Sequence, residues 1–220
     1  MKRSEIFLSY FVPVTIESAG SRFNPVLDVV LSAGKLSLNS RNSNYSYGSL
    51  QMLFEKAFRK LDIGWSCVED VLILGFGAGG VAEIINGYCS GCTIDGVEID
   101  EKVIELGKKY FHTELLQNVN LHCRSAEDYF SGCGKKYDLV VIDVYNDMDV
   151  PEGIERKEFL VEVKEHLRGG GTVIFNKFVH DRQSGSRIDA LRNLYSEVFG
   201  NVEIRSLMLT AKIFIARNNS

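Results

Sequence analysis

VLILGFGAGGVAEIINGYCSGCTIDGVEID, residues 71–100, is the stretch that decides the fold. An apolar run at 71–74 enters a glycine-rich turn at 75–80, and a segment with helical spacing follows at 81–88. A second apolar run, 93–99, carries acidic residues at its end. This order of strand, glycine turn, helix, strand and acid is the one that parallel α/β proteins use to hold a nucleoside-containing cofactor.

The residues of the turn and of the second strand fit that purpose. Glycine allows the backbone to turn at positive φ and to approach a ligand closely, and the amides that begin the next helix point into the same space. An acid at the end of the second strand is able to accept both hydroxyls of a ribose, and Glu98 and Asp100 are the two acids placed there. Glu98 follows Gly75 by 23 residues, a spacing near that expected for ribose contact, which disfavours a turn without a ligand.

Composition limits the class of protein. A chain of 220 residues is long enough for one sizeable core. The net charge of −4 argues against a nucleic-acid partner, and no apolar run approaches the roughly 20 residues of a membrane span. The N-terminus has no long apolar segment with a cleavage site, so we expect a cytoplasmic protein without a signal peptide.

Five cysteines and four histidines give no pattern of metal ligands. The pair Cys89 and Cys92 reads C-x-x-C, but it lies between a helix and a strand and has no second pair to complete a zinc site. We therefore expect no metal, and incidental thiols in a reducing compartment.

The rest of the chain alternates strands and helices. Over residues 71–180 this alternation predicts a parallel sheet covered on both faces. We expect a small N-terminal β region at 1–48 and a Rossmann-like domain at 49–220. Ser49 is the predicted N-cap of the first long helix. The predicted strands are 6–16, 26–31, 35–39, 119–123, 137–143, 172–176, 202–208 and 212–216, and the predicted helices are 50–61, 101–111, 125–130, 156–167 and 186–199.

Several segments together resemble spermidine synthases and their relatives. They are VLILGFGAGG, GVEIDEKVIELGKKYF, YDLVVIDVYND and EFLVEVKEHLRGGGTVIFN, and GKLSLNSRNSNYSYGSL is similar to the family's hairpin-and-gate region. The resemblance implies the α/β, Rossmann-like fold of class I methyltransferases, with a mostly parallel seven-stranded sheet and a C-terminal antiparallel hairpin. A small N-terminal β-hairpin region precedes it. The implied cofactor is S-adenosylmethionine or its decarboxylated form.

The same resemblance implies roles for individual residues. Asp143, at the end of the fourth strand, matches the acid that helps to deprotonate the attacking amine. Glu98 would hold the ribose hydroxyls. The implied cofactor-binding set is Gly75, Gly77, Gly79, Glu98, Ser125 and Ala126, and the implied substrate-binding set is Tyr47, Tyr145 and Asp147.

The sequence also departs from the family. Ala78 stands where synthases carry an acid for the free amine of the decarboxylated cofactor, and Ser125 replaces an acid beside the adenine. After the fourth strand Asn146 replaces the second acid, and Asp147 is displaced by one residue. A dication needs carboxylates at both ends of its pocket, because burying an unpaired ammonium is costly.

Three functions follow from these matches and departures. The first is a methyltransferase that uses S-adenosylmethionine and acts on an unknown acceptor. The second is an aminopropyltransferase that makes a polyamine from the decarboxylated cofactor with Asp143 as base, and the third is a non-catalytic binding relative. The expected partner is a small amine or another nucleophilic acceptor, and the N-terminal hairpin edge is the expected contact of a homodimer.

Overall fold

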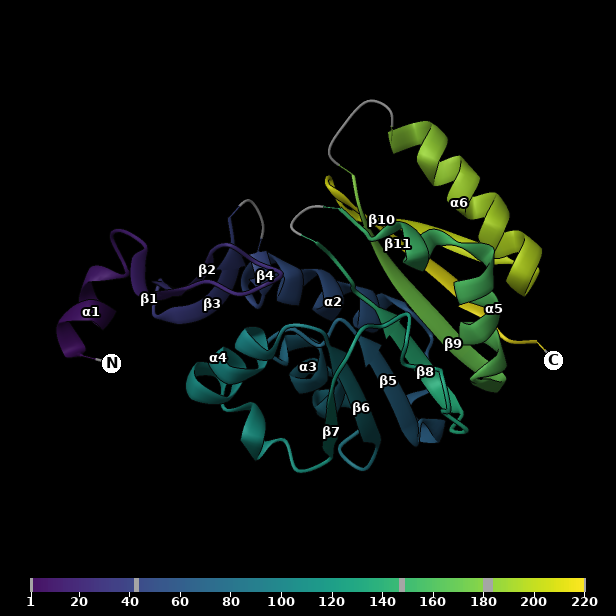
Figure 1. The fold of residues 1–220 in the computed structure, drawn as a ribbon, viewed down its shortest axis with the longest axis horizontal. Coiled ribbons are helices and arrows are strands. Elements are labelled where there is room, and N and C mark those ends of the chain that lie inside the picture. Colours follow the sequence, from purple (N-terminus) through teal and green to yellow (C-terminus); the bar gives the residue numbers. More distant parts are fainter. Residues whose placement is uncertain (1, 42–43, 147–148, 180–183, 220) are drawn as a thin grey trace.

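The structure is a computed structural model of the chain and describes residues 2–41, 44–146, 149–179 and 184–219. Two sheets organise it, and the smaller N-terminal sheet lies at one end of the molecule (Figure 1). The helices are α1 (Arg3–Leu8), α2 (Gly48–Lys60), α3 (Gly80–Tyr88), α4 (Glu101–Phe111), α5 (Lys157–Glu165) and α6 (Ser184–Phe199), with short 3₁₀ segments η1 (Trp65–Cys67), η2 (Thr113–Leu115) and η3 (Glu152–Glu155). The strands are β1 (Val14–Ala19), β2 (Leu27–Ser32), β3 (Lys35–Ser40), β4 (Asn44–Ser46), β5 (Asp70–Leu74), β6 (Thr93–Glu98), β7 (Val119–Cys123), β8 (Tyr137–Ile142), β9 (Leu167–Phe178), β10 (Val202–Met208) and β11 (Ala211–Arg217).

The large sheet has the order β10-β11-β9-β8-β5-β6-β7. Strands β5 to β9 are parallel, while β11 pairs antiparallel with both β9 and β10. The predicted Rossmann-like sheet with its C-terminal antiparallel hairpin is therefore confirmed. In register, Leu74 of β5 lies beside Val97 of β6 and Ile142 of β8. Glu98 and Asp143, each one residue further on, consequently reach the same carboxyl edge.

Apolar side chains cover both faces of this sheet. Along β5, Leu72 and Leu74 face a core built with α5 and α6, while Val71 and Ile73 face a core built with α2 and α3. All four side chains are fully buried. A strand that is covered on both faces needs apolar residues in succession, without alternating polar ones. The apolar run at 71–74 predicted this strand for that reason.

The N-terminal sheet is antiparallel, has the order β1-β2-β3-β4 and packs on α4. Leu27, Val29 and Leu38 meet Val103 and Leu106 of α4 in one buried apolar cluster. The Asp100 carboxylate then fastens this region to the large domain. It accepts hydrogen bonds from the Ser21 hydroxyl, from Asn24 Nδ2 at 2.8 Å, and from the Lys102 amide at 3.0 Å, where it caps α4. The Asp100 carboxylate thus has a structural role, and it is not the acid for the ribose hydroxyls.

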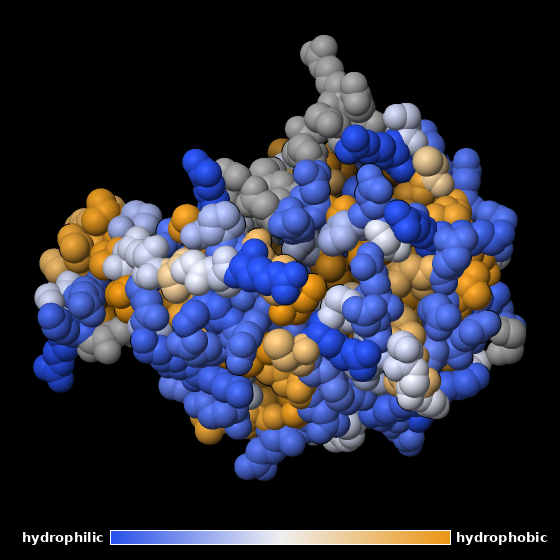
Figure 2. All heavy atoms as spheres, viewed as in Figure 1, coloured by the Kyte–Doolittle hydropathy of each residue, from blue (hydrophilic) through white to orange (hydrophobic). Residues whose placement is uncertain are grey.

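Exposed apolar side chains gather on helix α1 and on the residues that follow it up to Val12, as Figure 2 shows. Phe7 and Phe11 are 69% and 72% exposed, with ring centroids 5.3 Å apart. Strand β1 is an edge of its sheet. The homodimer contact expected in this region stays a prediction. Among the described residues, no helix is both long and apolar enough to span a bilayer.

Four local predictions were wrong. Residues 6–16 are mostly not a strand, because α1 occupies 3–8 with Glu5 accepting the Lys2 amide, and β1 begins only at Val14. Residues 125–130 form turns instead of a helix. Helix α2 begins at Gly48, so Tyr47 and not Ser49 is its N-cap. Strand β9 starts at Leu167, five residues before the predicted strand at 172–176.

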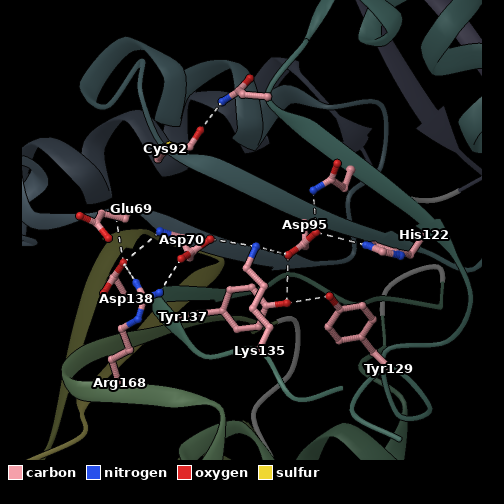
Figure 3. Close-up of polar contacts among 12 residues, drawn as sticks. Glu69, Asp70, Cys92, Asp95, His122, Tyr129, Lys135, Tyr137, Asp138 and Arg168 are labelled. Atoms are coloured by element: carbon pink, nitrogen blue, oxygen red, sulfur yellow. Dashed lines mark hydrogen bonds and ion pairs between the residues drawn. The ribbon is translucent and has the colours of Figure 1, made fainter. Parts of the chain in front are cut away.

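A polar network closes the opposite, amino edge of the sheet (Figure 3). Lys135 Nζ lies 2.8 Å from carboxylate oxygens of both Asp70 and the buried Asp95. Burial by itself raises the pKa of Asp95, but hydrogen bonds from Lys135, His122 and Asn120 outweigh it and hold the pKa below its ordinary value. Stability from this carboxylate is therefore present near neutral pH and is lost as pH falls through the depressed pKa.

Asp138 belongs to the same network. Its Oδ2 accepts the amides of Glu69 and Asp70, each at 2.9 Å, and Arg168 Nη1 at 2.6 Å. Asp138, near the start of β8, therefore lies at the edge opposite the carboxyl ends of the parallel strands. These contacts join the starts of β5 and β8 to β9 and fix how the strands align.

We predict that Lys135→Met lowers the free energy of unfolding by about 1–3 kcal/mol, because it leaves the buried Asp95 without its cation. The side chain of Lys135 is 35% exposed, which limits the loss. Urea unfolding at pH 7 measures the effect. The exposed neighbour Lys136→Met is the matched control. An equal effect of the two substitutions would show that the pairing is unimportant.

Candidate active site

A cavity of about 420 Å³ opens at the carboxyl edge of the large sheet. The loops after β5, β6, β7 and β8 contribute to it, together with α2, the end of β9 and the turn between β10 and β11. Ligands of open parallel sheets bind at this edge. Its lining includes Asn24, Leu50, Leu53, Gly75, Gly77, Glu98, Ser125, Ala126, Glu127, Asp143, Tyr145, Asn176, Phe178, Met208, Thr210 and Ala211.

Glu98 lines the cavity with a fixed carboxylate. The side chain is 2% exposed, Oε2 accepts the Gly77 amide at 2.9 Å, and Oε1 accepts the Asp100 amide at 3.0 Å. These bonds come from the glycine turn and from the residue before α4. The acid is therefore oriented by backbone on both sides, which suits a group that must accept hydrogen bonds from a ligand in one position.

The glycine turn contributes to the cavity only in part. Gly75 and Gly77 line it, whereas Gly79 does not. A Cβ on Gly75 would lie 2.2 Å from the Asp143 carbonyl oxygen, so glycine is needed where β5 and β8 end side by side. A Cβ on Gly79 would lie 2.8 Å from Thr113 Cγ2, which places this glycine at the packing of the turn against η2.

Asp143 is an acid of the cavity with a strongly raised pKa. Burial raises its pKa to about 7, the hydrogen bond from Asn176 opposes this, and the charge of Glu98 adds to it. Asn176 Nδ2 donates to Asp143 Oδ1 at 2.9 Å, and both side chains are buried. An acid with a pKa near neutral pH at the edge of a cavity is suited to general-base catalysis.

Asn176 is a candidate site residue that sequence reasoning missed. It is 2% exposed, and its Oδ1 has no hydrogen-bond partner among the described residues. A buried acceptor without a partner is costly unless a ligand satisfies it. The signal was present in the sequence, since Asn176 ends an apolar run at the carboxyl edge, as Asp143 does.

Tyr145 lines the cavity, but its hydroxyl is already engaged. It donates to the Asn176 carbonyl oxygen at 2.6 Å and accepts the Phe178 amide at 2.9 Å. Burial raises the pKa of Tyr145 well above its ordinary value. The tyrosine thus holds the loop after β8 against β9 while lining the cavity.

Ser125 and Ala126 lie together at the other end of the cavity. The Ser125 hydroxyl donates to Asp128 Oδ2 at 2.6 Å and accepts the Asp128 amide at 3.1 Å, so it closes a turn. Ala126 is buried beside this turn. Both residues line the cavity.

Tyr47, a predicted substrate residue, does not line this cavity. The Tyr47 ring stacks on Phe111, with ring centroids 4.6 Å apart, and burial followed by the charge of Glu83 raises its pKa. Tyr47 lines a small second pocket that also touches Asp143. Asp147 lies outside the described residues. In the part of the chain that is described, no group of three or more His, Cys, Asp or Glu is placed to hold a metal ion.

Ala78 lies away from the cavity. It is fully buried in the apolar cluster with Leu27, Val29 and Leu106, beneath the N-terminal sheet. An acid at this position would be buried among aliphatic side chains. The glycine loop therefore presents no carboxylate of its own to a ligand.

The described residues fit an adenosyl sulfonium. Glu98 would hold the ribose hydroxyls, the turn at Gly75 and Gly77 would border the sulfonium arm, and Ser125 and Ala126 would border the adenine. The observation behind this assignment is the donor set itself, in which the oriented Glu98 carboxylate, the turn at Gly75 and Gly77, and the small side chains of Ser125 and Ala126 line one cavity.

The comparisons with solved structures define the class. The human methyltransferase-like protein 13 in complex with SAH has a TM-score of 0.63 and 22% identity, covering 76% of this chain and 80% of that one. Spermidine synthase from Thermotoga maritima has a TM-score of 0.74 and 15% identity, covering 93% and 72%. The chain therefore has the Rossmann-like fold that class I methyltransferases and spermidine synthases share.

Sequence comparisons define the family. The spermine/spermidine synthase domain matches residues 65–209, and the chain belongs to that family. A probable polyamine aminopropyl transferase of Bifidobacterium longum is 32% identical over 133 residues, covering 60% of this chain and 29% of the relative. A polyamine aminopropyltransferase of Vibrio vulnificus is 30% identical over 139 residues, covering 60% and 44%. The match thus spans less than half of either relative, and it favours aminopropyl transfer over the generic methyl transfer that we expected first.

We predict that Glu98→Gln weakens binding of 5′-methylthioadenosine about 10- to 100-fold, the effect of losing hydrogen bonds to a charged acceptor. The new amide would also direct its NH₂ group at the Gly77 or Asp100 amide. Isothermal titration calorimetry measures the dissociation constant. The exposed Glu101→Gln, at the start of α4, is the control. Unchanged affinity in Glu98→Gln would exclude it as the ribose acid.

We predict that Asp143→Asn stabilises the fold at pH 8 by about 1–4 kcal/mol. Between roughly pH 4 and pH 7 the unfolded chain has released the proton that the folded chain retains, so the raised pKa destabilises the native protein as pH rises and does so fully above pH 7. Urea unfolding at pH 4.5 and pH 8 measures the difference. A gain of the same size at both pH values would contradict the raised pKa.

Proposed function

We propose that this chain transfers an aminopropyl group from decarboxylated S-adenosylmethionine to the nitrogen of an amine, with Asp143 as the base. The membership of the spermine/spermidine synthase family supports this reaction class. The position of Asp143 beside the cavity supports its role, because a general base must be within reach of the proton that it removes.

The observation that carries the proposal is the pair Asp143 and Asn176. One amide hydrogen of Asn176 orients the Asp143 carboxylate, and the unpartnered Asn176 Oδ1 lies in the same buried site. A primary amine has two hydrogens to donate, one to Asp143 and one to Asn176 Oδ1. This pair would orient the nitrogen lone pair away from both oxygens and towards the reacting carbon.

The reaction is a displacement at carbon. When bound, the cofactor supplies an electrophilic propyl carbon and a neutral thioether as leaving group. The new bond joins the amine nitrogen to that carbon, the carbon–sulfur bond breaks with its electron pair left on sulfur, and the amine proton goes to Asp143. Asp143 performs this role in its ionised form, so activity rises as pH passes through about 7.

Methyl transfer from S-adenosylmethionine is the second candidate, and Ala78 favours it. The glycine loop presents no carboxylate for the free amine of the decarboxylated cofactor, since position 78 is buried in an apolar cluster. The two reactions would use the same Asp143 and Glu98. They differ in which carbon–sulfur bond of the cofactor breaks, the one to the methyl group or the one to the aminopropyl group.

Product analysis distinguishes the two. The full chain is incubated with an amine mixture and each cofactor form, and mass spectrometry follows methylthioadenosine and S-adenosylhomocysteine. We expect methylthioadenosine from the decarboxylated form, with a rising pH profile centred near 7. Asp143→Asn should lower kcat about 10²- to 10⁴-fold, while the exposed, distant Asp62→Asn should not. Release of S-adenosylhomocysteine alone would contradict aminopropyl transfer.

A further inference from the structure

We infer that the small second pocket beside Asp143 holds one water molecule, which carries the amine proton from Asp143 to the solvent. The inference rests on the proposed function and extends it to the step after proton abstraction. Each turnover leaves one proton on Asp143, and the carboxyl group must release it before it acts as a base again. The large cavity is occupied by cofactor and amine during turnover, so the proton needs another path.

The two cavities share Asp143. This acid lines the large cavity and also the second pocket, whose walls come from β4, α2, the glycine turn and the start of α3. The second pocket has a volume of about 10 Å³. One ordered water requires roughly 10–15 Å³, so the pocket has the size of a single water and is too small for an amine or a cofactor.

The second pocket offers the polar partners that a water needs. Asp143 lines it with a carboxylate, Ser46 with a hydroxyl and Gln51 with an amide. A buried water makes roughly two to four hydrogen bonds, usually to such groups. Ser46 is 3% exposed, whereas Gln51 is only partly buried. The polar groups therefore lead from the buried acid to a side chain that solvent reaches.

The proton transfer needs no further reactant. The proton passes from the Asp143 carboxyl group to the oxygen of the water, while that water gives one of its own protons to solvent beside Gln51. Asp143 returns to its ionised form and the pocket again holds a neutral water. Ser46 and Gln51 act as positioning residues, because they orient the water without exchanging a proton with the substrate.

Tyr47 also lines this pocket, but its hydroxyl is engaged elsewhere. It donates to Glu83, and burial followed by the charge of Glu83 raises the pKa of Tyr47, so the hydroxyl keeps its proton. The Tyr47 backbone has a φ of 67°, in the left-handed region that disfavours residues with a Cβ. Backbone strain of this kind clusters at functional sites. At this strained turn, the Ser46 hydroxyl and the Tyr47 amide face Gly80.

Gly80 gives a way to displace the water without removing a polar group. A Cβ on Gly80 would lie 3.4 Å from Ser46 Oγ and from the Tyr47 amide nitrogen, which is an ordinary contact distance. Gly80→Ala therefore adds a methyl group to the wall of the pocket. Gly87→Ala is the matched control, because Gly87 lies in the same helix, is exposed, and has no atom within 4 Å of an added Cβ. Alanine favours a helix over glycine, so neither variant should unfold.

The first experiment locates the water without relying on turnover. Crystals of the full chain with methylthioadenosine are measured at a resolution that shows ordered waters. We expect one water within hydrogen-bond distance of both the Asp143 carboxylate and Ser46 Oγ, and its loss in Gly80→Ala. A dry second pocket in the unaltered chain would overturn the inference.

The second experiment measures the relay. Methylthioadenosine release from the decarboxylated cofactor, with 1,4-diaminobutane as acceptor at pH 8, gives kcat and KM in H₂O and in D₂O. Gly80→Ala should lower kcat about 10-fold at unchanged KM, and the ratio of kcat in H₂O to kcat in D₂O should rise, because proton release then limits the rate. Gly87→Ala should match the unaltered chain in both respects.

The outcomes separate the relay from the reaction. Equal kcat in Gly80→Ala and the unaltered chain, or a lower kcat with an unchanged solvent isotope effect, would overturn the relay and leave the proposed function intact. Absence of any aminopropylated product would contradict the proposed function. In that case the crystals alone decide whether the second pocket holds a water against Asp143.

Discussion

The burial of the Asp143 carboxylate at the carboxyl edge of the sheet is the constraint on which the site depends. The side chain reaches this place because β8 ends beside β5, and Gly75 is required there since any larger residue would collide with the Asp143 carbonyl. Desolvation raises the pKa of Asp143 to about 7. Asn176 is then positioned by β9 to orient the acid and to offer an acceptor of its own. The proposed base and the proposed nitrogen-binding group thus come from three neighbouring strands.

The two edges of the sheet have different roles: the amino edge stabilises the fold, and the carboxyl edge carries the candidate active site. At the amino edge, the carboxylates of Asp95 and Asp138 are matched by Lys135 and Arg168, and the pKa values of these two acids fall below the ordinary range. At the carboxyl edge, Asp143 has an amide rather than a cation as its partner, and its pKa rises. The first arrangement stabilises the folded chain at neutral pH, while the second destabilises it and leaves a reactive acid. The same sheet supports both because its strands begin at one edge and end at the other.

Sequence patterns predicted the parallel sheet, the glycine turn and both acids, because each is a local feature with a fixed period or position. They did not predict that Gly79 packs against η2 and that Ala78 packs beneath the N-terminal sheet, so that neither lines the cavity. These contacts depend on how η2 and the N-terminal sheet fold over the turn. The partner of Asp143 was equally invisible, because Asn176 lies 33 residues away in the chain. The long-range register that brings β9 beside β8 places Asn176 next to Asp143, and local sequence patterns do not determine that register.

The central claim is that Asp143 is held as a base with a near-neutral pKa in a dry, amine-accepting site. Carbon-13 NMR titration of the aspartate carboxyl groups tests it most directly, with Asp143→Asn providing the assignment. We predict one carboxyl resonance that titrates with a midpoint near pH 7 and is absent from the variant. A midpoint near 4 for Asp143 would contradict the account, because an acid of ordinary pKa would not be desolvated as the structure requires.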